Sequence, residues 1–102
     1  MRLIVMFDLP VTKAQERKAA SKFRKYIIEN GFYMLQYSVY TRIVNNFISI
    51  EKYTKRLKSH LPNRGSIYLL TVTDNQYSNM NILVGKPPTN DERVNSNSIS
   101  LF

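Results

Sequence analysis

The N-terminal stretch is the most strongly patterned part of the chain. Five consecutive apolar residues, Leu3 to Phe7, cannot alternate between a buried and a solvated face, so they predict a central strand covered on both faces. The run ends at Asp8, and Pro10 cannot continue a strand. An acid at the exit of a central strand lies where the sheet meets solvent. Asp8 is therefore the first candidate for chemistry, and an aspartate that only caps the turn is the alternative.

A first helix follows this strand. Thr12 and Gln15 fit a capping box, and the helix is expected to reach about Glu29, where Asn30-Gly31 ends it. Its apolar residues recur at intervals of three and four, which predicts one buried stripe. The residues of this stripe are Ala19, Ala20, Phe23, Tyr26 and Ile27.

A second helix is expected after Asn45 or Asn46, either of which can cap it, and before Pro62-Asn63 and Gly65. His60 lies near its C-terminal end, where an imidazole suits the helix dipole, so we expect an exposed residue and not a general base. The inner face is predicted to carry Phe47, Ile50, Tyr53, Leu57 and Leu61.

The segment 32–44 is rich in β-branched and aromatic residues and is expected to be extended. It has no Asn-Gly or Gly-Gly turn, so it forms either two short strands with a bend near Gln36 or one long bulged strand. Alternation predicts an apolar face and a polar face open to water or a partner. Val39, Thr41 and Ile43 form the first, and Ser38, Tyr40 and Arg42 the second.

A third apolar strand is expected at residues 66–73, followed by a turn at Asp74-Asn75 and a short strand at Met80 to Val84. This order predicts an α+β fold: a ferredoxin-like βαββαβ antiparallel sheet with two helices on one face and the first and third strands central. The strand at 66–73 would be a long apolar edge, which is an aggregation hazard if uncovered. We expect the extra strand at Met80 to Val84 to cover it, from the same chain or from the mate in a homodimer.

The composition changes after residue 84. Residues 1–84 are expected to form one domain and residues 85–102 a flexible polar tail. The apolar residues at its end, Ile99, Leu101 and Phe102, suggest a tip that docks on a partner, and a frayed terminus is the alternative.

The charge of the chain points to polyanionic partners. Fifteen Lys and Arg residues against seven Asp and Glu residues give a net charge of +8. We expect phosphate contacts at Lys13, Arg17 and Lys18 near the Asp8 turn, together with Arg42 on the polar strand face. The alternative surface is the outer helix face with Lys22, Lys25, Lys55 and Lys58.

Other residue types narrow the chemistry. The absence of cysteine and the single histidine exclude thiolate sites and histidine clusters. No apolar run approaches the roughly 20 residues of a membrane span, and no signal peptide is recognisable, so a cytoplasmic location is expected. The remaining possibility is metal-dependent phosphodiester hydrolysis, because hard cations prefer carboxylate oxygens. Only Asp8 sits at a central-strand exit, so a metal site would need a two-fold dimer that brings Asp8 and its mate together.

Three segments together resemble the CRISPR-associated protein 2 family, most closely the members from type II systems. They are residues 1–10, Leu35-Gln36-Tyr37-Ser38-Val39-Tyr40, and the segment from Gly65 to Thr73. The resemblance covers about residues 1–85. Phe7 stands where many relatives have tyrosine. We expect this difference to remove a hydroxyl next to Asp8.

The resemblance implies a homodimer with Asp8 as the metal-binding and catalytic residue of a Mg²⁺-dependent endonuclease. It also implies a role in spacer acquisition, in which the dimer holds double-stranded prespacer DNA while CRISPR-associated protein 1 performs the integration. The apolar tip at Ile99 to Phe102 fits a contact with that larger partner. Two alternatives are a stand-alone, toxin-like metal-dependent endoribonuclease and a non-catalytic ferredoxin-like RNA-binding module.

Overall fold

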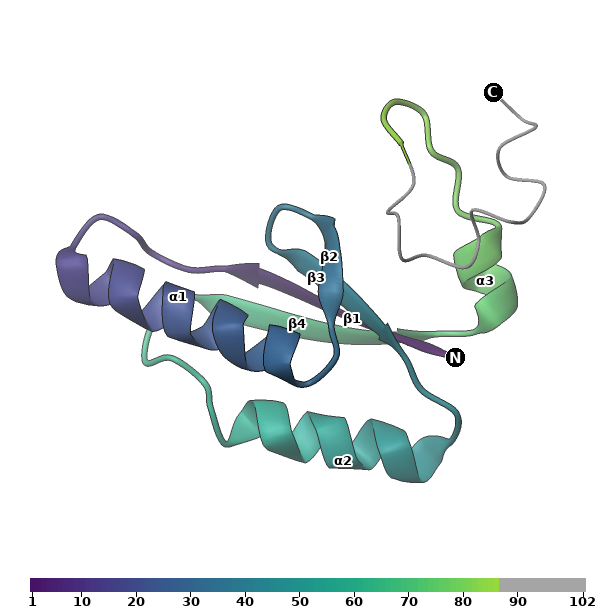
Figure 1. The fold of residues 1–102 in the computed structure, drawn as a ribbon, viewed down its shortest axis with the longest axis horizontal. Helices are drawn as coiled ribbons and strands as arrows, with labels where there is room; N and C mark the ends of the chain where they lie inside the picture. The colour runs from purple at the N-terminus through teal and green to yellow at the C-terminus, as the bar shows by residue number, and fades with distance from the viewer. Residues whose placement is uncertain (87–102) are drawn as a thin grey trace.

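The computed structural model describes residues 1–86 of the 102-residue chain. Its elements are, in order, β1 (Arg2–Asp8), α1 (Ala14–Glu29), β2 (Tyr33–Gln36), β3 (Val39–Ile43), α2 (Phe47–Lys58), β4 (Ser66–Val72) and α3 (Asp74–Ser78). The strands form one antiparallel sheet in the order β2-β3-β1-β4, and α1 and α2 lie on one of its faces (Figure 1). The predicted ferredoxin-like α+β fold, with the first and third strands central, is confirmed.

The hydrophobic core lies between the sheet and the two long helices. Leu3 and Val5 of β1 are fully buried there against Phe23 and Ile27 of α1 and Leu57 of α2. Each such side chain contributes about 1.5–3 kcal/mol when it is taken out of water. Because β1 is packed in this way and paired on both edges, its C-terminal residue Asp8 is carried on a rigid element.

The second face of β1 is more open than the apolar run predicts. Ile4 and Met6 point away from the helices and are only partly buried. Beside them on β4, Leu70 pairs with Ile4 and Tyr68 pairs with Met6, and both β4 side chains are exposed. Within residues 1–86 the prediction of a strand covered on both faces is therefore wrong for this half of β1.

The start of α1 differs by one residue from the predicted capping box. The N-cap is Lys13 and not Thr12, and the Lys13 N–H donates to Glu16 Oε1 at 2.9 Å. The cap is thus shifted by one residue, from Thr12 and Gln15 to Lys13 and Glu16, and only the Glu16 side chain takes part, because the lysine side chain has no acceptor. The predicted stripe and the stop at Asn30-Gly31 are confirmed.

The second helix is capped by Asn46, whose side-chain oxygen accepts a hydrogen bond from Ser49 N at 2.9 Å. Leu57 is buried, and Ile50 and Tyr53 pack against the core as predicted. Phe47 and Leu61 do not belong to this face, since their side chains are 75% and 50% exposed. Phe47 occupies the first helical position, and Leu61 follows the end of the helix at Lys58.

The segment 32–44 forms two short strands, and the bend lies at Tyr37-Ser38. The predicted polar face is wrong. Tyr40 is 4% exposed and Arg42 is half-buried, since both side chains point toward the helices opposite Val5 and Leu3. The pairing with β1 decides this, because it aligns the even residues of β3 with the helix-facing residues of the central strand.

The chain after β4 takes a path that the sequence does not suggest. Thr73 caps the short helix α3, where a simple turn was expected: its Oγ accepts from Gln76 N at 3.0 Å, and its N–H donates to Gln76 Oε1 at 2.9 Å. Residues 80–86 are not a strand; they line a groove with Leu35 and Gln36 of β2. The predicted strand at Met80 to Val84 therefore does not cover β4 of its own chain.

The predicted tail lies outside the described residues, apart from Gly85 and Lys86. None of the helices within residues 1–86 is long and apolar enough to cross a membrane.

Candidate functional site

Asp8 is the last residue of β1 and lies opposite Ser66 of β4. Strand alternation places its carboxylate on the face that the helices leave open, next to Met6 and away from Phe7. The side chain is exposed, and among the described residues it makes no hydrogen bond or ion pair. A carboxylate with this freedom is available to a cation or to a water molecule that attacks a substrate.

Two loops fix the position of the Asp8 exit. On one side, the N–H of the preceding residue Phe7 donates to Ser38 O at 3.0 Å, so the β2–β3 hairpin turn is tied to the end of β1. On the other side, Gly65, directly before β4, packs on the backbone of Asp8 and Leu9. The carboxylate is therefore presented between two anchored turns.

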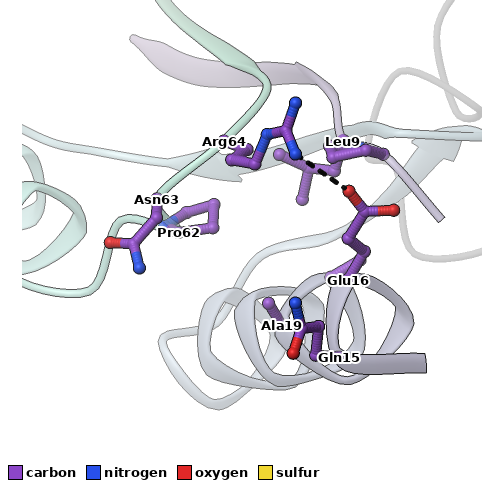
Figure 2. Close-up of a pocket in the computed structure, with 9 residues that line it drawn as sticks. Leu9, Gln15, Glu16, Ala19, Pro62, Asn63 and Arg64 are labelled. Carbon is purple, nitrogen blue, oxygen red and sulfur yellow. Dashed lines mark ion pairs between the residues drawn. The ribbon is translucent and has the colours of Figure 1, made fainter. Parts of the chain in front are cut away.

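A groove of about 360 Å³ opens beyond Asp8, between the β1–α1 loop, α1 and the α2–β4 loop. Figure 2 shows Arg64 reaching from the α2–β4 loop toward Glu16 on α1, with Leu9 and Pro62 beside them. Arg64 Nη1 and Glu16 Oε2 are 3.6 Å apart, and Glu16 is the more enclosed of the two. Because Glu16 also accepts from Lys13 N, it joins the start of α1 to the opposite loop. Asp8 does not line this groove, so its carboxylate faces open surface.

The carboxylates of one chain do not form a complete metal centre. Within residues 1–86, no group of three His, Cys, Asp or Glu side chains is close enough to hold a metal ion. Glu16 is engaged as described, and Asp74 accepts from the Met1 amino group at 2.8 Å. A single free carboxylate still fits Mg²⁺, which keeps several waters and is commonly bound by one or two carboxylates together with substrate phosphates.

Phe7 does not stand beside the Asp8 carboxylate. Its ring packs edge-on against Phe23 at 5.3 Å between centroids and stacks on Tyr40 at 5.8 Å, on the helix-facing side of the sheet. A tyrosine hydroxyl at position 7 would therefore lie on the opposite side of the strand from Asp8. The expectation that phenylalanine removes a hydroxyl next to Asp8 is wrong.

The residues expected to contact phosphates are only partly brought together. Lys13, the N-cap of α1, and Lys18, in the N-terminal half of this helix, are exposed. Arg17 is also exposed, but its Nη1 donates to Val11 O at 3.0 Å and Thr12 O at 2.8 Å, so it stabilises the β1–α1 loop.

Arg42 lies apart from these residues. Its Nη1 donates to Asn30 O at 2.6 Å, its Nε donates to Ile43 O at 3.0 Å, and its guanidinium lies over the Tyr53 ring at 4.0 Å. These contacts join β3 to both long helices. Arg42 is thus a packing residue on the helix side and does not extend a basic track from Asp8.

The alternative lysines, Lys22, Lys25, Lys55 and Lys58, are exposed on the helix layer. Lys22 and Lys25 border a second groove, of about 620 Å³, near the C-terminal end of α2. His60 is exposed there and stacks on Tyr26 with 3.6 Å between ring centroids. The expectation of an exposed His60 at this helix end is confirmed.

The sequence did not single out Tyr37, Ser38 or Gly65 as parts of this region. Ser38 is the only non-glycine residue with a positive φ among those described, at 62°. A signal was present for Gly65, which follows Pro62-Asn63 in a turn, but its contact with Asp8 depends on the tertiary structure. The predicted partner-binding residues Ile99, Leu101 and Phe102 lie outside the described residues.

Comparison with known proteins agrees with this geometry. The family model described as "CRISPR associated protein Cas2" matches residues 1–80. A protein of Acidovorax ebreus named "CRISPR-associated endoribonuclease Cas2" is 42% identical over 102 residues, covering all of both chains. The proteins of the same name from Ligilactobacillus salivarius and Streptococcus mutans are 49% and 43% identical; they cover 84% and 100% of this chain, and 85% and 92% of their own lengths. The chain therefore belongs to the Cas2 family of CRISPR-associated proteins.

Proposed function

We propose that this protein is a homodimeric subunit of the CRISPR adaptation complex. Within its family, we propose that it is most similar to the members from type II systems. In this role the dimer binds double-stranded prespacer DNA between subunits of the integrase CRISPR-associated protein 1. Asp8 supplies a Mg²⁺-dependent endonuclease site. The observation that carries the proposal is the exposed, unpaired carboxylate of Asp8 at the end of the central strand of a Cas2-family fold.

The open sheet face supports a dimer. Ile4 and Met6 are only partly covered, and their β4 neighbours Leu70 and Tyr68 are 48% and 67% exposed. A second copy that packs on this face removes apolar surface from water. The edge of β4 is then available to residues 80–84 of the mate, since those of its own chain do not pair with it. Asp8 lies on the same face, so two-fold symmetry brings both carboxylates to one interface.

These positions suggest separate roles for the carboxylates and for the basic residues. One carboxylate from each protomer would hold Mg²⁺, and the ion when bound supplies positive charge that stabilises a phosphodiester transition state. Asp8 is held on a rigid strand, so it can orient a water molecule without a conformational change. The exposed Lys13 and Lys18 would attract the phosphate backbone, which carries no sequence information.

A second candidate function is a stand-alone endoribonuclease. The relatives from Acidovorax ebreus and Ligilactobacillus salivarius support it, because their names describe an endoribonuclease. Both functions use Asp8, and they differ in the partner and in the nucleic acid that is bound.

The Asp8 site is tested by Asp8→Asn, which removes the charge and keeps the size. We expect this variant to lose Mg²⁺-dependent cleavage of RNA and DNA while its melting temperature and dimerisation are unchanged, because asparagine keeps the size of the side chain and the carboxylate makes no hydrogen bond or ion pair within its own described chain. Glu51→Gln, at an exposed acid on α2, is the matched control and should cleave like wild type. Full cleavage activity in Asp8→Asn would show that Asp8 only caps the turn and has no catalytic role.

The adaptation role is tested by co-purification with the integrase partner. We expect a stoichiometric complex that binds prespacer duplex, and deletion of residues 99–102 should weaken the complex without lowering the melting temperature. An undiminished affinity would show that the tip is not a docking segment. If no complex forms with the full chain while RNA is still cleaved, the stand-alone endoribonuclease is favoured.

A further inference from the structure

Tyr37 is the most exposed aromatic side chain in the described part of the protein, at 93% of its surface. It contributes no ring contact to the core, whereas Phe7, Phe23 and Tyr40 make ring contacts within it. Folding of the chain therefore gains almost nothing from an aromatic ring at this position. Its surroundings indicate what such a ring can do.

The backbone that carries Tyr37 is held beside Asp8. Met6 pairs with Val39, and the next residue, Phe7, donates its N–H to Ser38 O, so the hairpin turn follows the same antiparallel register toward Asp8. Ser38 adopts a φ of 62°, a region that L side chains enter reluctantly. A disfavoured backbone conformation that is fixed by the surrounding structure is a frequent mark of functional sites. The ring is thus exposed, but its attachment is rigid.

From this arrangement we propose that Tyr37 stacks on an unpaired base of a nucleic acid whose backbone lies at Asp8, so that this end of the sheet takes single-stranded substrate. The inference rests on the nuclease site proposed at Asp8 and specifies the substrate of that site, as distinct from the prespacer duplex that the dimer holds. Aromatic rings bind single strands because every base has an open π-face, whereas the bases inside a duplex are already stacked on each other. The high positive charge of the chain supplies the attraction for the phosphates.

Tyr68 does not offer the same platform. It lies opposite Met6 and next in line to Leu70 on the open apolar face, which the dimer proposal covers with a second copy. Tyr37 stands at the end of the sheet, in the turn beyond the last β2–β3 pair. The ring can therefore stay accessible at the rim when two sheets face each other.

The test measures binding and needs no cleavage. Fluorescence anisotropy in EDTA compares a labelled oligothymidine single strand with an abasic strand of the same length, which has the phosphates but no bases. We expect Tyr37→Ala to weaken binding of oligothymidine about tenfold and to leave binding of the abasic strand and the salt slope unchanged. Tyr37→Phe should retain wild-type affinity for both strands, because it keeps the ring.

Phe47→Ala is the matched control. Phe47 is 75% exposed, and it follows β3 at the end of the sheet opposite Asp8, so its loss should not affect either strand. An equal loss on the abasic strand, or no loss on oligothymidine, would overturn the stacking inference. So would a shift of Tyr37→Ala from dimer to monomer in sedimentation, because the ring would then be an interface residue.

The outcomes separate this inference from the function on which it rests. If the wild-type protein binds neither strand even at low salt, the proposed single-strand site and the nucleic-acid function at Asp8 fail together. If the wild-type protein binds and cleaves normally but Tyr37→Ala has the same affinity as wild type for both strands, only the role of Tyr37 is refuted.

Discussion

Gly65 lies so close to the backbone of Asp8 that no side chain fits between them. A Cβ atom at position 65 would stand 2.6 Å from Asp8 O and 2.8 Å from Leu9 Cδ2, and the residue has a φ of +98°. Both features require glycine. The contact sets the distance between the exit of the central strand and the loop that begins β4, and thus helps to position the candidate catalytic carboxylate.

Replacement of Gly65 by alanine should therefore destabilise the protein by about 2–3 kcal/mol, because strain in the left-handed region adds to the close contact. Gly85→Ala is the control, since Gly85 has a φ of +107° but nothing within 4 Å of its Cβ position. It should cost less, about 1 kcal/mol, because only the backbone strain remains. Urea unfolding of both variants measures the difference, and equal losses would contradict a specific contact with Asp8.

Arg42→Ala should lower the free energy of unfolding by about 1.5–3 kcal/mol, because it removes the hydrogen bond to Asn30 O and the stacking on Tyr53. Arg42→Lys should not regain the stability that Arg42→Ala loses, because lysine lacks the planar guanidinium. Arg24→Ala, at an exposed position on α1, is the control and should stay within about 0.5 kcal/mol of wild type. A stable Arg42→Ala protein with reduced DNA binding would return Arg42 to the phosphate-contacting set.

Lys13 and Lys18 are exposed cations at the start of α1, the end of the helix that follows the Asp8 turn. The double variant Lys13→Ala/Lys18→Ala should weaken duplex DNA binding for all sequences alike. It should reduce the slope of log K against log salt by about 0.9 for each phosphate that the protein no longer neutralises. The comparison is Lys55→Ala/Lys58→Ala on α2, which removes the same charge from the helix layer. If only this second pair lowers the slope, DNA lies against the helices.

Glu16→Ala should destabilise the protein by about 1 kcal/mol, since it removes the acceptor of the Lys13 N–H and the partner of Arg64. Gln15→Ala should be nearly neutral, although the sequence pattern assigns the capping role to Thr12 and Gln15. Thermal unfolding of both variants decides between the two capping boxes. A larger loss for Gln15→Ala would favour the pattern-based start of α1.

Much of the fold could be predicted because its elements are marked by local chemistry. The apolar run before Asp8, the spacing of Phe23 and Ile27, the cap at Asn46 and the stop at Asn30-Gly31 each depend on neighbours a few residues away. These signals give the order of strands and helices, and that order admits few topologies. The position of Asp8 at the exit of a central strand follows from the same reasoning.

Strand faces, cap register and loop contacts needed the tertiary structure. Tyr40 and Arg42 face the helices because the pairing of β3 with β1 sets the phase of alternation, and a shift of one residue reverses every side chain. The composition of the strand alone does not set this phase, so a polar face was expected where the structure has a packed one.

The amino-acid pattern is enough to predict a basic ferredoxin-like chain with one acid at the exit of its central strand. The surroundings of that acid depend on how the whole chain folds. The approach of Gly65 and the turn at Tyr37-Ser38 join segments that are far apart along the chain, and no periodic pattern within either segment encodes the distance between them. Long-range pairing of β1 with β3 and β4 brings them together, so the composition of the site became visible only in the folded sheet.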